Sequence, residues 1–136
     1  MSLAILDTDM LAEAFKSKNS VVVGHAADYF DAYGQFVFSA MTRFEVIRGL
    51  RQKRSPRLNQ RFDELCRRSL VLPIGDDVLD RAADLWVVAR RGGHPHRDAD
   101  LIIAATALVH ARTLVTGNTP HFAWVPGLTL MNWREP

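Results

Sequence analysis

Four side chains with oxygen ligands stand where apolar runs of the sequence begin or end. They are Asp7, Glu45, Asp100 and Asn118, with Asp98 as a further candidate. Carboxylates that are brought together repel one another, and a hard divalent cation such as Mg²⁺ or Mn²⁺ is the usual remedy. Such a cation can activate a water molecule and neutralise a phosphodiester in its transition state. The set therefore predicts metal-dependent hydrolysis of a phosphodiester.

Each acid also has a purely structural interpretation. Asp7 can cap the helix that follows it, and Glu45 can be the return half of a capping box that begins at Thr42. Asp98 is a natural N-cap for the helix that it opens. Asp98 and Asp100 point about 200° apart around a helix, so they cannot share a face. Asp100 leads directly into the apolar segment and is the better inward-facing candidate.

Apolar and amphipathic segments indicate the elements that must bring these acids together. Short strands are expected near residues 3–6, 36–38, 70–74, 114–116 and 128–131. Helices are expected over about residues 10–16, 21–33, 42–54, 57–68, 76–91 and 98–108. Strands that alternate with helices predict a parallel sheet covered on both faces. We therefore expect a single domain over residues 1–136 with an α/β fold, a three-layer sandwich whose central parallel sheet has four or five strands.

Ligands of such a sheet bind beyond the carboxyl ends of its strands. Asp7 follows the first expected strand, Glu45 lies within one helical turn of the second, and Asn118 follows the fourth. The helix that Asp100 opens is apolar on nearly all sides, which predicts that it is buried. Asp100 would then lie at the edge of the core, and neighbouring strands would bring the acids to one crevice.

Basic residues concentrate in the middle of the chain. Residues 43–68 contain nine basic and three acidic residues, a net charge of +6, whereas the whole chain carries +2. A basic middle joined to acidic ends indicates a polyanionic partner held beside a carboxylate-rich site, although a solvated helical face explains the same charges. Within this segment, Phe44, Ile47 and Leu50 are expected to face the core.

The remaining signals favour a reduced cytoplasmic protein. The single cysteine, Cys66, cannot form an internal disulfide. The apolar run over residues 3–6 is too short for a membrane span and lacks the basic region of a signal peptide, so no membrane association is expected. The five histidines show no zinc-site spacing with cysteine, which favours ordinary surface residues.

Several short motifs resemble the PIN-domain family, in particular its VapC-type toxins. The residues that carry the resemblance are Leu6-Asp7-Thr8, the segment 39–45 with Gly49, the segment 100–107, the segment 114–118, Phe122 and the segment 126–128. They occur in the family's order and cover nearly the whole chain. Each motif is short, and the set is more specific than any of its members.

The resemblance implies a metal-dependent endoribonuclease, the toxin of a toxin–antitoxin pair, that uses Mg²⁺ or Mn²⁺ and is inhibited by a cognate antitoxin. In the family, acids matching Asp7, Glu45 and Asp100 hold the metal. Many members carry a fourth acid where this chain has Asn118 and, slightly later, His121. The missing charge puts the metal affinity, and a second metal, in doubt.

Further residues are assigned supporting roles. Asn118 and Asp98 are expected to complete the site through water. The hydroxyl residues expected to orient the carboxylates are Thr8, Thr42 and Thr116. The candidates for contact with the RNA backbone or with an acidic antitoxin surface are Arg48, Arg51, Arg54, Arg57 and Arg61. By resemblance, the antitoxin docks between the helices of residues 42–70, and the chain forms a homodimer.

Two alternatives differ in class. The chain can be a PIN-like RNA-binding or regulatory module whose pocket has lost activity, as Asn118 in place of an acid indicates. The segment Asp7-Thr8-Asp9 also resembles the nucleophile motif of haloacid-dehalogenase-like phosphatases, with Lys53 and the segment 75–80 as their later motifs. That interpretation leaves Glu45 and Asp100 without a role.

Overall fold

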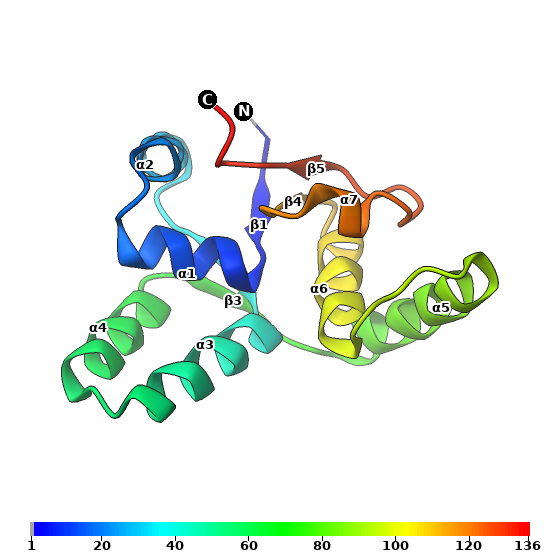
Figure 1. Cartoon of the computed structure of the whole chain (residues 1–136), viewed down its shortest axis with the longest axis horizontal. Coiled ribbons are helices and arrows are strands. Elements are labelled where there is room, and N and C mark those ends of the chain that lie inside the picture. The colour runs from blue at the N-terminus through cyan, green and yellow to red at the C-terminus, as the bar shows by residue number, and fades with distance from the viewer. Residues whose placement is uncertain (1) are drawn as a thin grey trace.

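The computed structural model describes residues 2–136, which form an α/β fold (Figure 1). Its strands are β1 (Ala4–Leu6), β2 (Val37–Ser39), β3 (Leu70–Leu72), β4 (Thr113–Val115) and β5 (Leu130–Met131). Its helices are α1 (Thr8–Lys16), α2 (Ser20–Tyr33), α3 (Ala40–Lys53), α4 (Pro56–Arg67), α5 (Asp76–Gly92), α6 (Asp98–Val109) and α7 (Thr119–Phe122). In this part of the chain, no helix is both long and apolar enough to cross a membrane.

The strands form one parallel sheet of five, in the order β3-β2-β1-β4-β5. The register pairs Leu6 of β1 with Phe38 of β2 on one side and with Val115 of β4 on the other. The carboxyl ends of these three strands therefore lie level with one another. This confirms the expected parallel sheet, and its central strand is the one that Asp7 follows.

The two faces of the sheet bury separate apolar clusters. Ala4 and Leu6 of β1 pack in a cluster with residues of α1, α2, α3 and α4, whereas Ile5 between them packs in a cluster with residues of α5 and α6. Successive side chains of a strand point to opposite faces, so even this short strand contributes to both layers of helices. The result is a three-layer sandwich, with α1–α4 on one side and α5 and α6 on the other (Figure 1).

Helix α6 is buried over most of its length, as its apolar composition predicts. Leu101 and the run Ile103–Ala107 are all less than a tenth exposed. Its small residues allow close packing against α5, whose inward stripe includes Val78, Ala82 and Leu85. Asp100 in the first turn is therefore carried by a rigid, buried element.

Two expectations about α3 are wrong. The helix begins at Ala40, and its N-cap is Ser39, whose hydroxyl accepts a hydrogen bond of 3.1 Å from the Thr42 N–H. Thr42 therefore does not open a capping box, and the Glu45 carboxylate is free for other contacts. Phe44 does not face the core but is 55% exposed, with the Arg48 guanidinium over its ring.

The exposure of two phenylalanines predicts opposite responses to the same substitution. Phe62 of α4 is 1% exposed and packs against the rings of Phe15 and Phe38. Phe62→Ala should lower the free energy of unfolding by about 3–5 kcal/mol, because it removes buried apolar surface and leaves a cavity. Phe44→Ala is the matched control and should cost less than about 1 kcal/mol. Urea unfolding measures both, and equal losses would contradict the packing described here.

Candidate functional site

Asp7 is held rigidly at the carboxyl end of β1. Its N–H donates to the Val115 carbonyl at 3.0 Å, which continues the pairing of β1 with β4 by one residue. Its carboxylate caps α1, because Asp7 Oδ1 accepts a hydrogen bond of 2.8 Å from the Met10 N–H. An aspartate that caps a helix satisfies an otherwise unpaired N–H and favours the helix dipole. Asp7 is nevertheless 7% exposed, so its other oxygen is confined to the interior edge of the sheet.

Glu45 reaches the same region from the second turn of α3. It is 8% exposed, and its Oε1 accepts a hydrogen bond of 2.7 Å from the Thr8 hydroxyl. The Thr8 hydroxyl also lies 3.2 Å from the Thr42 hydroxyl, which is fully buried. The two threonines therefore connect the start of α1 to α3, and Thr8 fixes one oxygen of Glu45.

Asp100 contributes the third carboxylate, from the first turn of α6. The Arg97 N–H and the Arg97 Nε–H both donate to Asp100 Oδ2 at 3.4 Å, and Arg97 Nη2 lies 3.2 Å from Oδ1. The His121 Nε2 lies 2.9 Å from Asp100 Oδ2. The helix begins at Asp98 as expected, but its N-cap is Arg97 and not Asp98. Asp100, at the third helical position, accepts from the Arg97 N–H, which is the return contact of a capping box and not the N-cap role that the sequence assigned to Asp98.

One cavity of about 230 Å³ joins these elements. The residues that line it are Asp7, Thr8, Asp9, Glu45, Arg48, Arg97, Asp100 and Ile103. Carboxylates that lie 38 and 55 positions apart in the chain therefore share one polar hollow at the carboxyl ends of the central strands, where open α/β sheets bind their ligands. We call this the acidic cavity.

Residues 4–125, most of the chain, match the family model of the PIN domain. The chain belongs to the PIN domain family. The match includes Asp7, Glu45 and Asp100, and it ends just beyond α7.

Individual proteins are similar to this PIN domain in sequence or in structure over most of its length. The chain is 26% identical over 121 residues to Ribonuclease VapC1 of Methanocaldococcus jannaschii, covering 89% of this chain and 79% of that protein. A chain in the crystal structure of VapBC2 from Rickettsia felis, bound to a DNA fragment from their promoter, superposes with a TM-score of 0.85 at 21% identity, covering 96% and 98% of the two chains. A toxin–antitoxin complex from Klebsiella pneumoniae gives a TM-score of 0.70 at 27% identity, covering 93% and 95%.

The acidic cavity of this PIN domain fits a hard divalent cation by the chemistry of its donors. Carboxylate oxygens in a small polar hollow are the ligands that Mg²⁺ and Mn²⁺ prefer. Within residues 2–136, however, no three histidine, cysteine or acidic side chains converge closely enough to hold an ion as they stand. The Arg97 guanidinium lies between two of the carboxylates instead, with its Nη1 3.5 Å from Glu45 Oε2.

Two expected contributors to the site lie apart from the acidic cavity. Asn118 is exposed just before α7, where its backbone N–H donates to the Thr116 hydroxyl, and Asp98 is exposed at the start of α6. Neither is among the residues that line the cavity. Their water-mediated roles stay predictions.

His121 reaches the site in the region where the fourth acid was expected. It lies in α7 and contacts Asp100, and its backbone carbonyl accepts a hydrogen bond of 3.0 Å from the Trp124 indole. The sequence favoured surface roles for all five histidines, and for His121 this was wrong, because only the fold brings α7 against the start of α6. The one signal in the sequence was its position close to the missing acid.

Asp7 and Asp100 have opposite pKa shifts although they line the same cavity. Burial raises the pKa of Asp7 from 3.8 to about 6, against hydrogen bonds from the Thr116 hydroxyl and the Met10 N–H that lower it. Burial also acts to raise the pKa of Asp100, but hydrogen bonds and charge from Arg97 and His121 outweigh it and leave the pKa below its usual value. Asp100 has Arg97 and His121 as close partners, whereas Asp7 lacks a close cationic partner among the contacts described.

The five candidate arginines do not share one surface. Arg48 lines the acidic cavity, Arg51 lines a separate cavity of about 350 Å³ between α3 and α4, and Arg61 lines a third. Arg54 ends α3 and Arg57 lies in the first turn of α4. The five arginines therefore lie at different places on the hairpin of α3 and α4, and among them only Arg48 lies beside the carboxylates.

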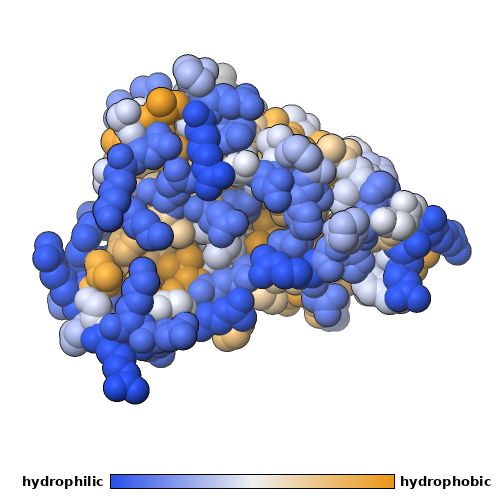
Figure 2. All heavy atoms as spheres, in the orientation of Figure 1, coloured by the Kyte–Doolittle hydropathy of each residue, from blue (hydrophilic) through white to orange (hydrophobic). Residues whose placement is uncertain are grey.

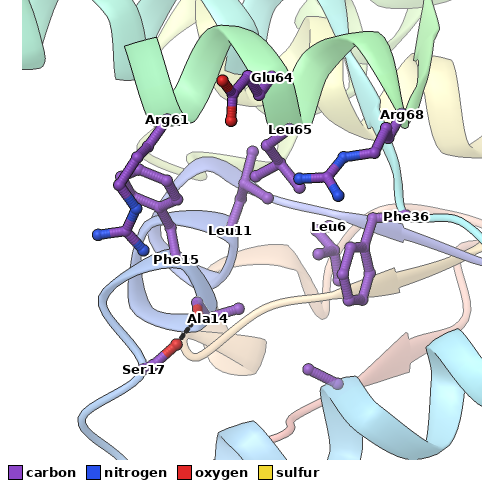
Figure 3. A pocket seen from close by; sticks show the side chains of 11 residues that line it. Leu6, Leu11, Ala14, Phe15, Ser17, Phe36, Arg61, Glu64, Leu65 and Arg68 are labelled. Carbon is purple, nitrogen blue, oxygen red and sulfur yellow. Dashed lines mark hydrogen bonds between the residues drawn. The ribbon is translucent and has the colours of Figure 1, made fainter. Parts of the chain in front are cut away.

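The third cavity is lined mainly by apolar side chains together with the charged side chains of Arg61, Glu64 and Arg68 (Figure 3). It measures about 250 Å³ and includes Leu11 and Phe15 of α1 and Leu65 of α4. The Arg61 guanidinium lies over the Phe15 ring, and Arg68 also lines the cavity. The space-filling view shows apolar surface within a mostly hydrophilic face in the region between α1 and α4 (Figure 2). We call this the α1–α4 groove.

The raised pKa of Asp7 predicts a pH-dependent cost to stability. The carboxyl titrates near 3.8 in the unfolded chain and near 6 in the folded one, so its contribution to stability is present below pH 3.8 and is lost as the pH rises to about 6. Asp7→Asn keeps an oxygen that can accept from Met10. In EDTA at pH 7 this change should raise the free energy of unfolding by up to about 3 kcal/mol, and near pH 4 it should have little effect. Urea unfolding at the two pH values measures the difference, and an effect that does not depend on pH would contradict the assignment.

Proposed function

We propose that this PIN domain is a metal-dependent endoribonuclease and the toxin of a toxin–antitoxin pair. The observation that carries the proposal is that Asp7, Glu45 and Asp100, each buried, line a single polar cavity at the carboxyl ends of the central strands. The similarity to a ribonuclease of Methanocaldococcus jannaschii supports RNA as the substrate. The similarity to chains of toxin–antitoxin complexes supports a protein inhibitor.

Asp7, Glu45 and Asp100 would hold Mg²⁺ or Mn²⁺ in this site. When bound, the cation supplies acidity to the attacking water and positive charge for the phosphate in the transition state. Thr8 fixes one oxygen of Glu45, so the other oxygen, which now contacts arginines, is the one available to a cation. Thr116 orients Asp7 through its hydroxyl in the same way.

Substrate binding is assigned to the basic residues beside the acidic cavity. Arg48 is 58% exposed, lines the cavity and contacts Glu45 Oε2 at 3.3 Å, so its guanidinium can turn towards an RNA phosphate without leaving the site. The exposed residues of the hairpin, Arg51, Arg54 and Arg57, extend the positive surface away from the cavity. Phosphate contacts of this kind add salt-sensitive affinity without sequence preference.

The antitoxin is assigned to the α1–α4 groove. Apolar side chains flanked by Arg61, Glu64 and Arg68 suit an amphipathic segment whose apolar residues fill the groove and whose acidic residues face the two arginines (Figure 3). The groove lies between α1 and α4 and includes no residue of α3, so it differs from the docking between the helices of residues 42–70 that the family resemblance implies. A homodimer stays a prediction from the family resemblance.

The phosphatase alternative is not supported. Lys53 ends α3 and the segment 75–80 begins α5, and neither contributes a residue to the acidic cavity. The RNA-binding alternative keeps one supporting observation, which is that Asn118 replaces an acid and stands outside the cavity. Cleavage assays separate this alternative from the nuclease.

The nuclease proposal predicts that cleavage depends on both the cation and Asp7. The chain should be co-expressed with the product of its neighbouring gene, freed from it, and incubated with total RNA. Cleavage in Mg²⁺ should stop in EDTA and fall at least a hundredfold in Asp7→Asn, because one ligand of the cation is lost. Asp28→Asn, which changes an exposed acid of α2, is the matched control and should cleave normally.

RNA binding, measured by filter retention, should survive in Asp7→Asn. Cleavage that persists in both EDTA and Asp7→Asn would refute the mechanism. RNA binding without cleavage by the unsubstituted protein, in Mg²⁺ and in Mn²⁺, would favour the RNA-binding module.

A further inference from the structure

Arg97 makes more contacts with the carboxylates of the acidic cavity than any other basic side chain described there. Its Nη1 lies 3.5 Å from Glu45 Oε2 and its Nη2 lies 3.2 Å from Asp100 Oδ1. Two further contacts of 3.4 Å reach Asp100 from its Nε and from its backbone N–H. One guanidinium thus joins the carboxylate of α3 to that of α6, across a gap that no backbone hydrogen bond spans.

The position of Arg97 lets it leave the cavity without unfolding any element. It is the N-cap of α6, so its backbone belongs to the loop that precedes the helix. Its side chain is 63% exposed, whereas those of Glu45 and Asp100 are 5% and 12% exposed. The two carboxylates are therefore fixed, whereas the Arg97 guanidinium between them is carried by a long side chain that is open to solvent on one side.

We propose that Arg97 is an internal counter-ion of the metal site, which holds Glu45 and Asp100 together in the metal-free protein and which a divalent cation must displace. The inference rests on the proposed function, because it takes the acidic cavity as the place where the cation binds. The Arg97 guanidinium and the metal ion would pair with the same carboxylate oxygens, so each weakens the binding of the other. Arg97 thereby raises the concentration of divalent metal ion that is needed to fill the site.

Arg48 provides a comparison within the same cavity. It also contacts Glu45 Oε2, at 3.3 Å, and its side chain is similarly exposed, at 58%. No contact between Arg48 and Asp100 is described, and it lies one helical turn from Glu45 on the same helix. Its removal leaves the bridge between α3 and α6 in place, so its effect on cation binding should be the smaller of the two.

The inference predicts changes of opposite sign in two measurements on Arg97→Ala. Isothermal titration with Mn²⁺ alone, without RNA, should show binding on the order of tenfold tighter than in the unsubstituted protein, because the competing charge is gone. In EDTA the same variant should melt at a lower temperature, because two buried carboxylates lose their counter-ion. Arg48→Ala should show a smaller gain in affinity. Arg67→Ala, which removes an exposed arginine paired only with Asp63 among its described contacts, should change neither measurement.

The outcomes separate this inference from the proposed function. Tighter Mn²⁺ binding by Arg97→Ala together with a lower melting temperature in EDTA supports the inference. Mn²⁺ binding by Arg97→Ala but not by the unsubstituted protein supports it as well. Mn²⁺ binding that is unchanged or weaker in Arg97→Ala overturns it while leaving the metal-dependent nuclease intact. If no variant binds Mn²⁺, both fail. A lower melting temperature alone indicates a structural ion pair and also overturns the inference.

Discussion

Three buried carboxylates that repel one another line a single cavity, and the surrounding structure has to make their proximity tolerable. Asp7 accepts a hydrogen bond from the first turn of α1, Glu45 accepts one from the Thr8 hydroxyl, and Asp100 accepts from Arg97. Each carboxylate thus has part of its hydrogen-bonding capacity satisfied by its own neighbourhood, which fixes its direction. The second oxygen of Glu45 contacts Arg48 and Arg97, and the oxygens of Asp100 contact Arg97 and His121. The proposed metal-dependent function rests on this arrangement.

The sheet order brings the three acids together. Placing β1 at the centre, with β2 and β4 on its two sides, aligns the carboxyl ends of strands that are far apart in sequence. The helices that follow or precede these ends then deliver Glu45 from one layer and Asp100 from the other. Because α6 is buried among apolar residues, Asp100 has little freedom to retreat from the site. The separate α1–α4 groove leaves the acidic cavity open while offering a different surface to a protein partner.

Much of this arrangement could be predicted from the sequence, because it depends on patterns along the chain. The apolar run before Asp7 predicts a buried strand, and the apolar run after Asp100 predicts a buried helix; both are confirmed. The errors concern contacts between distant segments. Arg97 reads as part of a loop, and nothing local shows that it bridges Glu45 and Asp100. Similarly, the residue that caps α3 depends on where β2 ends: β2 extends to Ser39 and α3 follows directly, so Ser39 and not Thr42 is the N-cap.

The most direct measurement of the central claim is a crystal structure of the protein grown with Mn²⁺, using anomalous diffraction to locate the ion. The account predicts an anomalous peak in the acidic cavity, coordinated by oxygens of Asp7, Glu45 and Asp100, with the Arg97 guanidinium turned away from them. A peak elsewhere on the molecule, with the guanidinium still between Glu45 and Asp100 at saturating Mn²⁺, would contradict it.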